Sequence, residues 1–370
     1  MLTRFTVKNF KPFQKQLVFD LGSPGNYEFN SEVIDNEENA ISKAIVYGFN
    51  GCGKSSLGLA IFDLILHLTD KEKGLADYEP YLNLDLSDSA VACFEYQFRF
   101  HGSVLIYSYK KAAMNVLTEE SLSIDGRQCI YYDFKKHDGF VKLSGAETLK
   151  ISVDDNQISR VKYVSSNAIL NKNKENKVFS SFMSFVNNML MFYSLDNRGY
   201  RGFRTGGDNI CEAILNAKKL KDFEAFLQEN NIDLKLTAGE INGKKAILAK
   251  YRNASVDFFK IASTGTSSLA LFYYWYIVLE KASLVYLDEF DAFYHFELAE
   301  SIVNHLKKLQ KTQIILTTHN TDLLSNDLLR PDCYYWLDNG QIRSLNRLTE
   351  KELRKAHNLQ KMFKAGAFHE

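Results

Sequence analysis

Proline, cysteine and unbalanced charge are all scarce in this sequence. Only 4 of its 370 residues are proline, which argues against a linker-rich chain. Lysine plus arginine number 45, as do aspartate plus glutamate, so the overall charge identifies neither a nucleic-acid nor a membrane partner. The cysteines are widely spaced and form no C-x-x-C pair, which suggests neither a zinc site nor a disulfide framework. They are Cys52, Cys93, Cys129, Cys211 and Cys333.

Long apolar runs are also missing. The longest, residues 269–279, falls well short of the roughly 20 residues that a membrane span needs. The opening MLTRFTVKNFKPF carries charges within an alternating pattern and lacks the apolar block of a signal peptide. No heptad pattern is sustained, which excludes a long coiled coil. These absences predict a cytoplasmic protein with no membrane partner.

What is present is an ordered succession of strands and helices, with a hydrophobic content of 45% that is ample for a core. Residues 90–151 alternate like an antiparallel meander with short turns. Strands are also predicted for the first twenty residues, for residues 44–51 and before residue 263. A solvated turn is predicted for the charged, asparagine-rich stretch KYVSSNAILNKNKENK at residues 162–177. Helices are predicted for SSLGLAIFDLILHLT and for residues 178–194, 209–229, 266–281 and 294–310.

The stretch GFNGCGKSS, residues 48–56, matches G-x-x-x-x-G-K-[ST] between a strand and a helix. Backbone N–H groups of such a loop cradle phosphate oxygens, and its glycines permit the close approach. Lys54 would neutralise the β- and γ-phosphates, and the Ser55 hydroxyl would ligate Mg²⁺. ATP and Mg²⁺ are therefore the predicted cofactors. The loop residues predicted to bind nucleotide are Gly48, Asn50, Gly51, Cys52, Gly53, Lys54, Ser55 and Ser56.

Two later strands end in residues that carry chemistry. SLVYLDEF ends in Asp288, predicted to reach Mg²⁺, and Glu289, predicted to polarise the attacking water. QIILTTHN ends in His319, in the position of a γ-phosphate sensor. We expect both tips at one edge of a parallel sheet, where ligands of open α/β sheets bind. The predicted catalytic residues are Glu289, His319 and Lys54, and the predicted metal ligands are Ser55 and Asp288.

A polar patch, S-T-G-T-S-S from Ser263, stands before the apolar helix predicted at residues 266–281. One interpretation is a helix cap, because a serine side chain can accept from free N–H groups of the first turn. The other is that this helix start faces the phosphate of a nucleotide held by a second subunit. The two interpretations are compatible.

The order of these motifs resembles the ABC-type ATPase head shared by SMC and RecF-like proteins and by AAA-family ATPases of bacterial abortive-infection and restriction-linked phage-defence loci. The resemblance covers most of the chain. It implies that VKNFKPF places Lys11 near the nucleotide, that Ser263 and Gly265 complete the site of an opposing subunit, and that Asp291 belongs to the D-loop. It also implies a head-to-tail homodimer around two ATP, or a higher oligomer.

The sequence departs from the family pattern in two places. The signature reads S-T-G-T rather than S-G-G-[QE], and only Asp291 of DAFYH stands where a D-loop residue is expected. The Q-loop residue stays open between Gln97 and residues 165–167.

The predicted fold is α/β, a P-loop NTPase of ABC-ATPase type: an antiparallel meander plus a mostly parallel core flanked by helices, with a compact helical insertion. The predicted domains are an N-terminal ATPase lobe at 1–160, the helical lobe at 161–250, a C-terminal ATPase lobe at 251–345 and a basic tail at 346–370.

Two functions follow from the resemblance, and a third interpretation is a nucleotide-regulated scaffold with negligible turnover. The first is a slow, partner-regulated ATPase that acts on an effector encoded by a neighbouring gene in anti-phage defence. The second is a DNA repair or loading ATPase of RecF type. Residues 341–370 hold seven Lys/Arg and three Asp/Glu, and Arg198, Arg201 and Arg204 add a second basic spot. Since such clusters are more often solvated faces than nucleic-acid sites, DNA stays the alternative partner.

Overall fold

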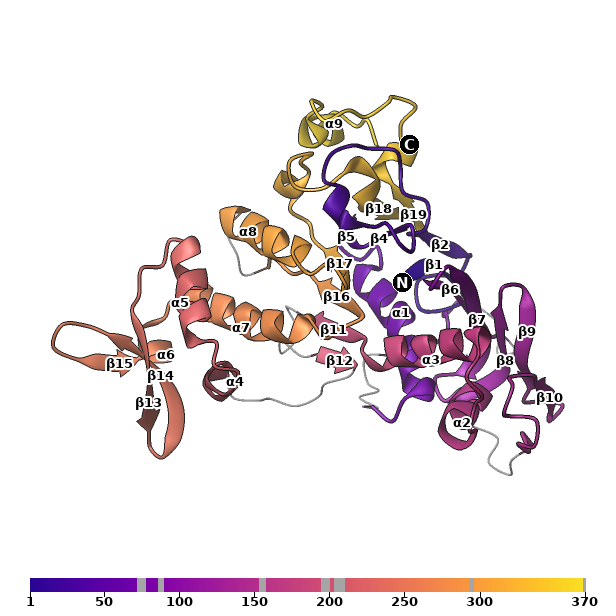
Figure 1. The fold of residues 1–370 in the computed structure, drawn as a ribbon. Coiled ribbons are helices and arrows are strands. Elements are labelled where there is room, and N and C mark those ends of the chain that lie inside the picture. Colours follow the sequence, from indigo (N-terminus) through magenta and orange to yellow (C-terminus); the bar gives the residue numbers. More distant parts are fainter. Residues whose placement is uncertain are drawn as a thin grey trace.

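The structure, a computed structural model, describes residues 1–71, 78–85, 90–152, 158–193, 200–202, 210–292 and 296–368. Two sheets and the helices packed on them make up most of this part of the chain (Figure 1). The helices are α1 (Lys54–Leu68), α2 (Arg160–Asn167), α3 (Lys174–Asn187), α4 (Ile210–Asn216), α5 (Leu220–Glu229), α6 (Phe258–Ile261), α7 (Thr264–Leu279), α8 (Phe296–Lys307) and α9 (Leu359–Lys364).

The first sheet is antiparallel, in the order β10-β9-β8-β7-β6-β1-β2. Its strands alternate between buried and less buried residues, as the sequence pattern predicted. The meander predicted at residues 90–151 is thereby confirmed. The strands are β1 (Leu2–Lys8), β2 (Leu17–Asp20), β6 (Ala92–Phe100), β7 (Ser103–Ala113), β8 (Val116–Ile124), β9 (Arg127–Asp133) and β10 (Asp138–Val141).

The second sheet, the core sheet, has the order β12-β11-β16-β17-β5-β18-β19. Its five inner strands run parallel, and β12 and β19 are antiparallel edges. Strands β5, β16 and β17 are buried at every position, which accounts for their mainly apolar sequences. The strands are β5 (Lys43–Tyr47), β11 (Leu190–Tyr193), β12 (Tyr200–Gly202), β16 (Leu284–Asp288), β17 (Gln313–Thr317), β18 (Tyr334–Asp338) and β19 (Gln341–Ser344).

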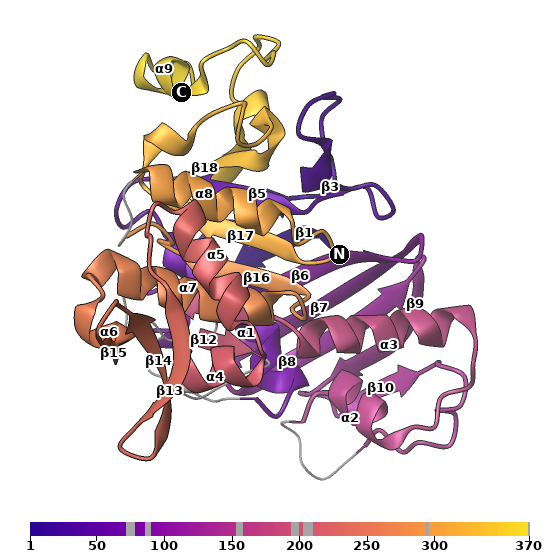
Figure 2. The same cartoon turned by 60° about the vertical axis from the view of Figure 1, so that its left-hand side comes forward.

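Two smaller sheets complete the described strands. One joins β13 (Leu236–Ile241), β14 (Lys244–Lys250) and β15 (Ser255–Asp257), and it lies with α4 and α5 beside α7 in both views (Figures 1 and 2). The other pairs β3 (Ile34–Asp35) with β4 (Ala40–Ile41). Short 3-10 turns lie at Ser31–Val33, Thr321–Leu323, Pro331–Cys333 and Leu345–Arg347.

Helix α1 links the two large sheets. At its start, the Tyr286 hydroxyl of β16 donates to the Lys54 carbonyl at 2.5 Å. One turn and a half later, the Tyr96 hydroxyl of β6 donates to the Ala60 carbonyl at 2.8 Å. Since α1 begins where the phosphate-binding loop ends, the meander and the core sheet together determine where that loop lies.

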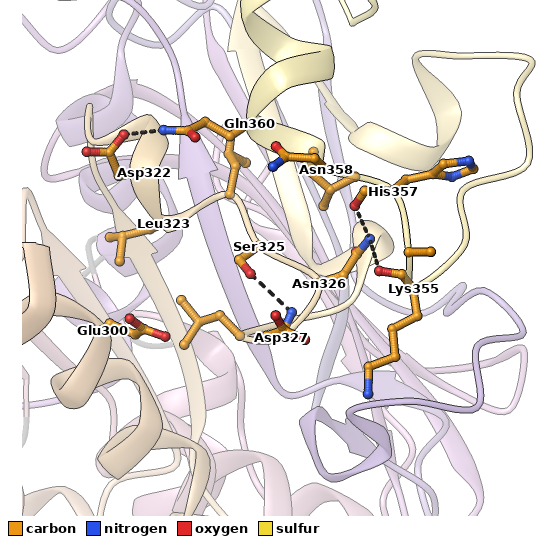
Figure 3. Close-up of a pocket in the computed structure, with 14 residues that line it drawn as sticks. Glu300, Asp322, Leu323, Ser325, Asn326, Asp327, Lys355, His357, Asn358 and Gln360 are labelled. Atoms are coloured by element: carbon orange, nitrogen blue, oxygen red, sulfur yellow. Dashed lines mark hydrogen bonds between the residues drawn. The ribbon is translucent and has the colours of Figure 1, made fainter.

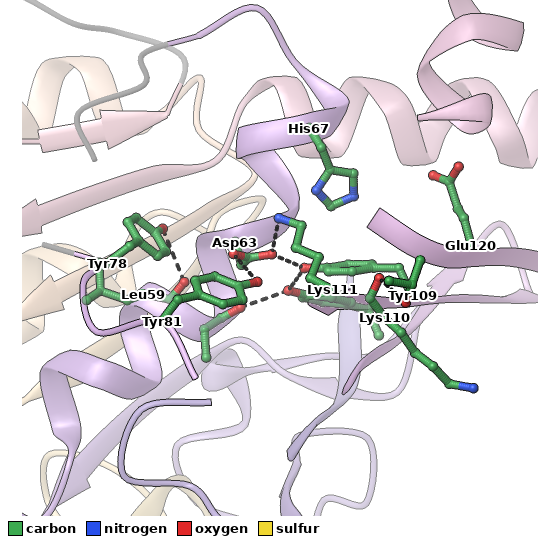
Figure 4. A network of polar contacts seen from close by, with 12 residues as sticks. Leu59, Asp63, His67, Tyr78, Tyr81, Tyr109, Lys110, Lys111 and Glu120 are labelled. Carbon is green, nitrogen blue, oxygen red and sulfur yellow. Dashed lines mark hydrogen bonds and ion pairs between the residues drawn. The ribbon is translucent and has the colours of Figure 1, made fainter. Parts of the chain in front are cut away.

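A buried polar cluster fastens α1 to the meander (Figure 4). The Asp63 carboxylate pairs with the Lys111 ammonium at 2.7 Å and accepts from the hydroxyls of Tyr81 at 3.0 Å and Tyr109 at 2.8 Å. Asp63 and Lys111 are 0% and 1% exposed. Burial lowers the pKa of Lys111, and the nearby Asp63 charge opposes that shift.

Two sequence predictions of helices need correction. The helix predicted at residues 178–194 ends at Asn187, and Leu190–Tyr193 instead form β11, parallel to β16. Asn187 and Asn188 end the helix, because their side-chain amides donate back to its carbonyls at Met183 and Ser184. The helix predicted at 209–229 is divided into α4 and α5.

Three further predictions concern the turn before α3, the arginine-rich loop and the helical insertion. The turn predicted at residues 162–177 is wrong at both ends, because residues 160–167 form α2 and α3 begins at Lys174. Helix α2 is capped by the Ser159 hydroxyl, which accepts from the Lys162 N–H. Arg198 and Arg204 of the predicted arginine-rich loop lie outside the described residues, and the Arg201 side chain is not described either. The predicted domain boundaries stay a prediction. The insertion predicted as helical also contributes β11 to the core sheet.

Candidate functional site

The glycine-rich loop follows β5, in the middle of the core sheet, and leads into α1. Gly51 and Gly53 have φ angles of 78° and 106°, which a residue with a side chain rarely adopts. Gly48 is needed for space, since a Cβ there would lie 2.5 Å from the Leu337 carbonyl oxygen. The loop conformation is therefore accessible mainly to glycine at these positions.

Lys54 is buried at the bottom of this loop. Its ammonium donates to the carbonyls of Gly48 at 3.1 Å and Phe49 at 3.3 Å, and it lies 2.8 Å from the His319 Nε2. Burial lowers the pKa of Lys54, while the Glu289 and Asp288 carboxylates oppose that shift. A bound phosphate is the kind of anion that would replace these carbonyl contacts.

Ser55 and Asp288 are brought together from α1 and from the end of β16. The Ser55 hydroxyl donates to one carboxylate oxygen of Asp288 at 2.6 Å, and the Thr317 hydroxyl donates to the other at 2.7 Å. Burial raises the pKa of Asp288, against the effect of these two hydrogen bonds.

This donor set fits Mg²⁺. One hydroxyl and one carboxylate are enough protein ligands, because Mg²⁺ usually keeps several waters and takes its other oxygens from substrate phosphates. Within the described residues no group of three or more His, Cys, Asp or Glu could hold a metal by itself. The arrangement is thus compatible with a metal that arrives with its nucleotide.

Glu289 and His319 face each other across the tips of β16 and β17. The His319 Nε2 lies 3.3 Å from a Glu289 carboxylate oxygen, and both side chains are partly exposed. Glu289 has a φ of 43°, an uncommon conformation for a residue other than glycine. The candidate base and the candidate sensor thus lie within hydrogen-bonding distance of one another, and the sensor also lies within that distance of Lys54.

Asp291 lies just beyond this pair. Its carboxylate accepts from the Thr318 hydroxyl at 2.7 Å, and the same hydroxyl accepts from the Asn320 N–H at 2.9 Å. Burial raises the pKa of Asp291, and the Thr318 hydrogen bond opposes that shift. Asp291 is therefore attached to the loop that carries His319.

Lys11 lies in a segment that packs against the glycine loop. A Cβ on Gly53 would stand 3.1 Å from the Pro12 side chain and 3.2 Å from the Phe13 ring. Lys11 has a φ of 47°, and its ammonium donates to the Pro80 carbonyl at 3.4 Å. The segment that the resemblance placed near the nucleotide therefore contacts the loop.

The remaining loop residues differ in exposure. Asn50 is exposed, and Cys52 and Ser56 are half-buried. The Cys52 N–H donates to the Phe49 carbonyl at 3.2 Å, and burial raises the pKa of the Cys52 thiol. A thiol of raised pKa is a poor nucleophile, so its position in the loop matters more than its reactivity.

Ser263 caps α7, as one of the two interpretations predicted. Its hydroxyl accepts from the Thr266 N–H at 3.1 Å, and the side chain is exposed. Figure 1 shows α6, which directly precedes it, beside β14 and β15, whereas α1 lies near the centre of the molecule. A Cβ on Gly265 would meet no atom closer than 3.9 Å. Within one chain, the start of α7 and the loop before α1 are at separate places.

Neither Q-loop candidate is brought to the loop by the contacts described. The Gln97 amide donates to the Thr3 hydroxyl in β1 at 3.3 Å, and the Asn167 amide donates to the Tyr163 carbonyl within α2 at 2.9 Å. The Q-loop residue stays open.

A cavity of about 650 Å³ lies apart from these residues, between the segment after His319 and the C-terminal segment (Figure 3). Asn326 lines this cavity, and its side-chain amide donates to the carbonyls of Arg354, Lys355 and His357. The Gln360 amide of α9 donates to the Asp322 carboxylate, which lies in the 3-10 turn Thr321–Leu323. These contacts hold residues 354–360 against the segment that follows His319.

Thr317 and Thr318 are two site residues that no sequence motif identified. Both hydroxyls contact carboxylates of the site, Thr317 that of Asp288 and Thr318 that of Asp291. The signal was present, because two hydroxyl residues at the end of a buried, mainly apolar strand need hydrogen-bond partners.

A parallel core sheet with a G-x-x-x-x-G-K-S loop at one strand tip, and an acidic pair at a neighbouring tip, defines a P-loop NTPase. The chain belongs to the family described as "AAA domain, putative AbiEii toxin, Type IV TA system", whose model matches residues 43–325. No curated protein matches the sequence. The chain is thus an ATPase of the AAA type. Among the described residues, no helix is longer than the 16-residue α7, so this part of the chain contains no long coiled coil.

Three solved structures are similar to the chain. The SMC head domain from Thermotoga maritima is 13% identical, with 92% of this chain and 97% of that chain covered and a TM-score of 0.41. An SMC head bound to the C-terminal winged-helix domain of ScpA is 14% identical, with coverage of 94% and 99% and a TM-score of 0.42. An SMC head from Pyrococcus furiosus with an extended coiled coil, bound to the C-terminal domain of ScpA, is 12% identical, with coverage of 94% and 97% and a TM-score of 0.40. In the described part of this chain, no helix is long and apolar enough to cross a membrane.

Proposed function

We propose that this protein binds ATP with Mg²⁺, hydrolyses it slowly, and dimerises head to tail around it to regulate a partner effector in anti-phage defence. The observation that carries the proposal is the meeting of Lys54, Ser55, Asp288, Glu289 and His319 at one edge of the core sheet. These groups come from three separate segments of the chain. Together their side chains supply a cation, a pair of metal ligands and a base in one place, which is what phosphoryl transfer to water requires.

Each side chain has a distinct task in this proposal. Bound ATP would supply the phosphoryl group, and Mg²⁺ would offset part of its charge. Lys54 would exchange its loop carbonyls for phosphate oxygens, and Ser55 and Asp288 would hold the metal. Glu289 would take the proton of the attacking water, and His319 would orient the group that is attacked.

The dimer is proposed because the start of α7 is exposed and separate from the loop of its own chain. In a head-to-tail pair, Ser263 and Gly265 of one subunit would close over the Lys54 loop of the other. The capping hydrogen bond to Thr266 is compatible with this role, since it leaves other N–H groups of the first turn available.

Ser263→Arg tests this arrangement. We expect the affinity of the monomer for ATP to stay within about threefold, because its own loop is unchanged. ATP-dependent dimerisation should weaken roughly 100-fold or more, because an unpaired charge in a closed interface costs several kcal/mol. Turnover should fall with it. Sedimentation and a phosphate-release assay measure the two effects.

The matched control is Ser255→Arg, the same change at an exposed position of β15. It should leave dimerisation and turnover unchanged. Loss of ATP binding by the Ser263→Arg monomer would instead place Ser263 in the site of its own chain and contradict the head-to-tail pair.

The proposal of a partner effector is supported by the family description, which names a toxin–antitoxin system. Purified protein should associate with the product of a neighbouring gene with little dependence on salt. Binding to duplex DNA that weakens steeply with salt would favour the DNA-repair alternative, because such a slope reports contacts to phosphates.

A further inference from the structure

Thr317 lies at the centre of the candidate site without having been assigned any role there. It is the last residue of β17 and is 0% exposed. Strand β17 runs parallel to β16, with Leu316 opposite Leu287. Thr317 therefore lies beside the end of β16, where Asp288 and Glu289 follow.

Thr317 contacts three consecutive residues at that point. Its hydroxyl donates to the Asp288 carboxylate and accepts from the Glu289 N–H, both at 2.7 Å. Its backbone carbonyl accepts from the Phe290 N–H at 3.2 Å. The one hydroxyl proton and one of the oxygen lone pairs are therefore both engaged by the acidic pair.

The Glu289 backbone needs such support. Its φ of 43° lies in the left-handed region, which a residue other than glycine occupies only when its surroundings hold it there. Thr317 accepts the N–H groups on both sides of the Glu289 α-carbon. The resulting conformation brings the Glu289 carboxylate within 3.3 Å of the His319 ring.

The Asp288 carboxylate is held from two sides, by Ser55 and by Thr317. If Ser55 turns an oxygen lone pair to Mg²⁺, as the proposed function requires, its proton can still be donated to Asp288. Thr317 donates to the other carboxylate oxygen, so the two hydroxyls together fix the orientation of the Asp288 carboxylate.

We propose that Thr317 is a positioning residue for ATP hydrolysis, which sets the Asp288 carboxylate for Mg²⁺ and the Glu289 carboxylate for the attacking water through one hydroxyl. This inference rests on the proposed function. Thr317 touches neither nucleotide nor water in this role and acts through the two carboxylates.

The test compares Thr317→Val, which keeps the shape and removes the hydroxyl, with Thr317→Ser, which keeps the hydroxyl. We expect Thr317→Val to lower kcat by about 100-fold, because a small misplacement of catalytic groups has an effect of that order. At saturating Mg²⁺, KM for ATP should stay within about threefold, since the loop is unchanged. Thr317→Ser should retain most of the turnover.

Binding of a non-hydrolysable ATP analogue, titrated with MgCl₂, gives a second readout that does not need turnover. The Mg²⁺ concentration for half-maximal binding should rise about tenfold or more in Thr317→Val, because loss of a hydrogen bond to a metal ligand weakens metal binding by that order. It should stay unchanged in Thr317→Ser.

The matched control is Thr312→Val. Thr312 directly precedes β17, is 1% exposed, and its hydroxyl donates to the Leu279 carbonyl at 2.9 Å. A purely structural effect of a lost buried hydroxyl would appear in both variants as a lower melting temperature. Only Thr317→Val should change kcat and the Mg²⁺ dependence.

The outcomes separate this inference from the proposed function. Suppose that the wild-type protein hydrolyses ATP and that Thr317→Val stays within threefold of it in both kcat and the Mg²⁺ concentration for half-maximal binding. That result would overturn the role of Thr317 and leave the proposed function standing. So would a Thr317→Ser variant as impaired as Thr317→Val, because the hydroxyl would then not be what matters. Wild-type protein without turnover would refute the proposed hydrolysis, while the Mg²⁺ titration would still decide whether Thr317 orients Asp288.

Discussion

Replacing Glu289 with glutamine should lower ATP turnover by about 1000-fold, since a general base contributes two to four orders of magnitude to a rate. The amide keeps the size of the side chain but cannot take a proton from water. ATP binding should be preserved, because Lys54, Ser55 and Asp288 are unchanged. We therefore expect the variant to accumulate as an ATP-bound dimer, detectable by sedimentation with and without ATP.

Glu280→Gln provides the control for Glu289→Gln. It makes the same change at an exposed position directly after α7 and should leave turnover at the wild-type level. Unchanged turnover in Glu289→Gln would assign the base to another group. Wild-type protein that never hydrolyses ATP would refute the proposed enzyme and leave a nucleotide-regulated scaffold.

The second large effect is expected at Asp63, far from the chemistry. Asp63→Ala should lower the free energy of unfolding by about 3–5 kcal/mol, because it leaves the Lys111 ammonium buried without its counter-charge. It also removes the acceptor of the Tyr81 and Tyr109 hydroxyls. Urea unfolding followed by circular dichroism measures the change.

Two further variants make the Asp63 result specific. Asp70→Ala removes a carboxylate that pairs with Lys162 at the same 2.7 Å but is 95% exposed, so it should change stability by no more than about 1 kcal/mol. The double variant Asp63→Leu with Lys111→Met should recover most of the loss, because apolar residues of similar volume can replace a buried ion pair. A single Asp63→Ala variant as stable as the wild type would contradict the cluster's role in holding α1.

The local motifs were predictable from sequence for a physical reason. The G-x-x-x-x-G-K-S loop needs glycines with positive φ and a lysine at a fixed spacing. Its geometry therefore depends only on residues that are adjacent in the sequence. The same holds for the Ser263 cap and for the apolar strands ending at Asp288 and Thr317, whose continuous burial shows directly as composition.

The errors arose where non-local pairing competes with local preference. The apolar run that ends in Leu190–Tyr193 continues the spacing of a helix, yet β16 offers it a parallel partner, and the two asparagines before it end the helix. The Q-loop residue could not be chosen either, because nothing in the local sequence separates Gln97 from residues 165–167.

The sequence by itself determined the order of the motifs and predicted the nucleotide class and the candidate metal ligands, because each is carried by a short run with its own spacing and polarity. Only the tertiary structure decided which side chains meet. Thr317 contacts both Asp288 and Glu289, and Asp63 of α1 contacts Lys111 of the meander. In each case the contacting residues are far apart in the chain. Such contacts depend on strand order and register, which no local pattern specifies.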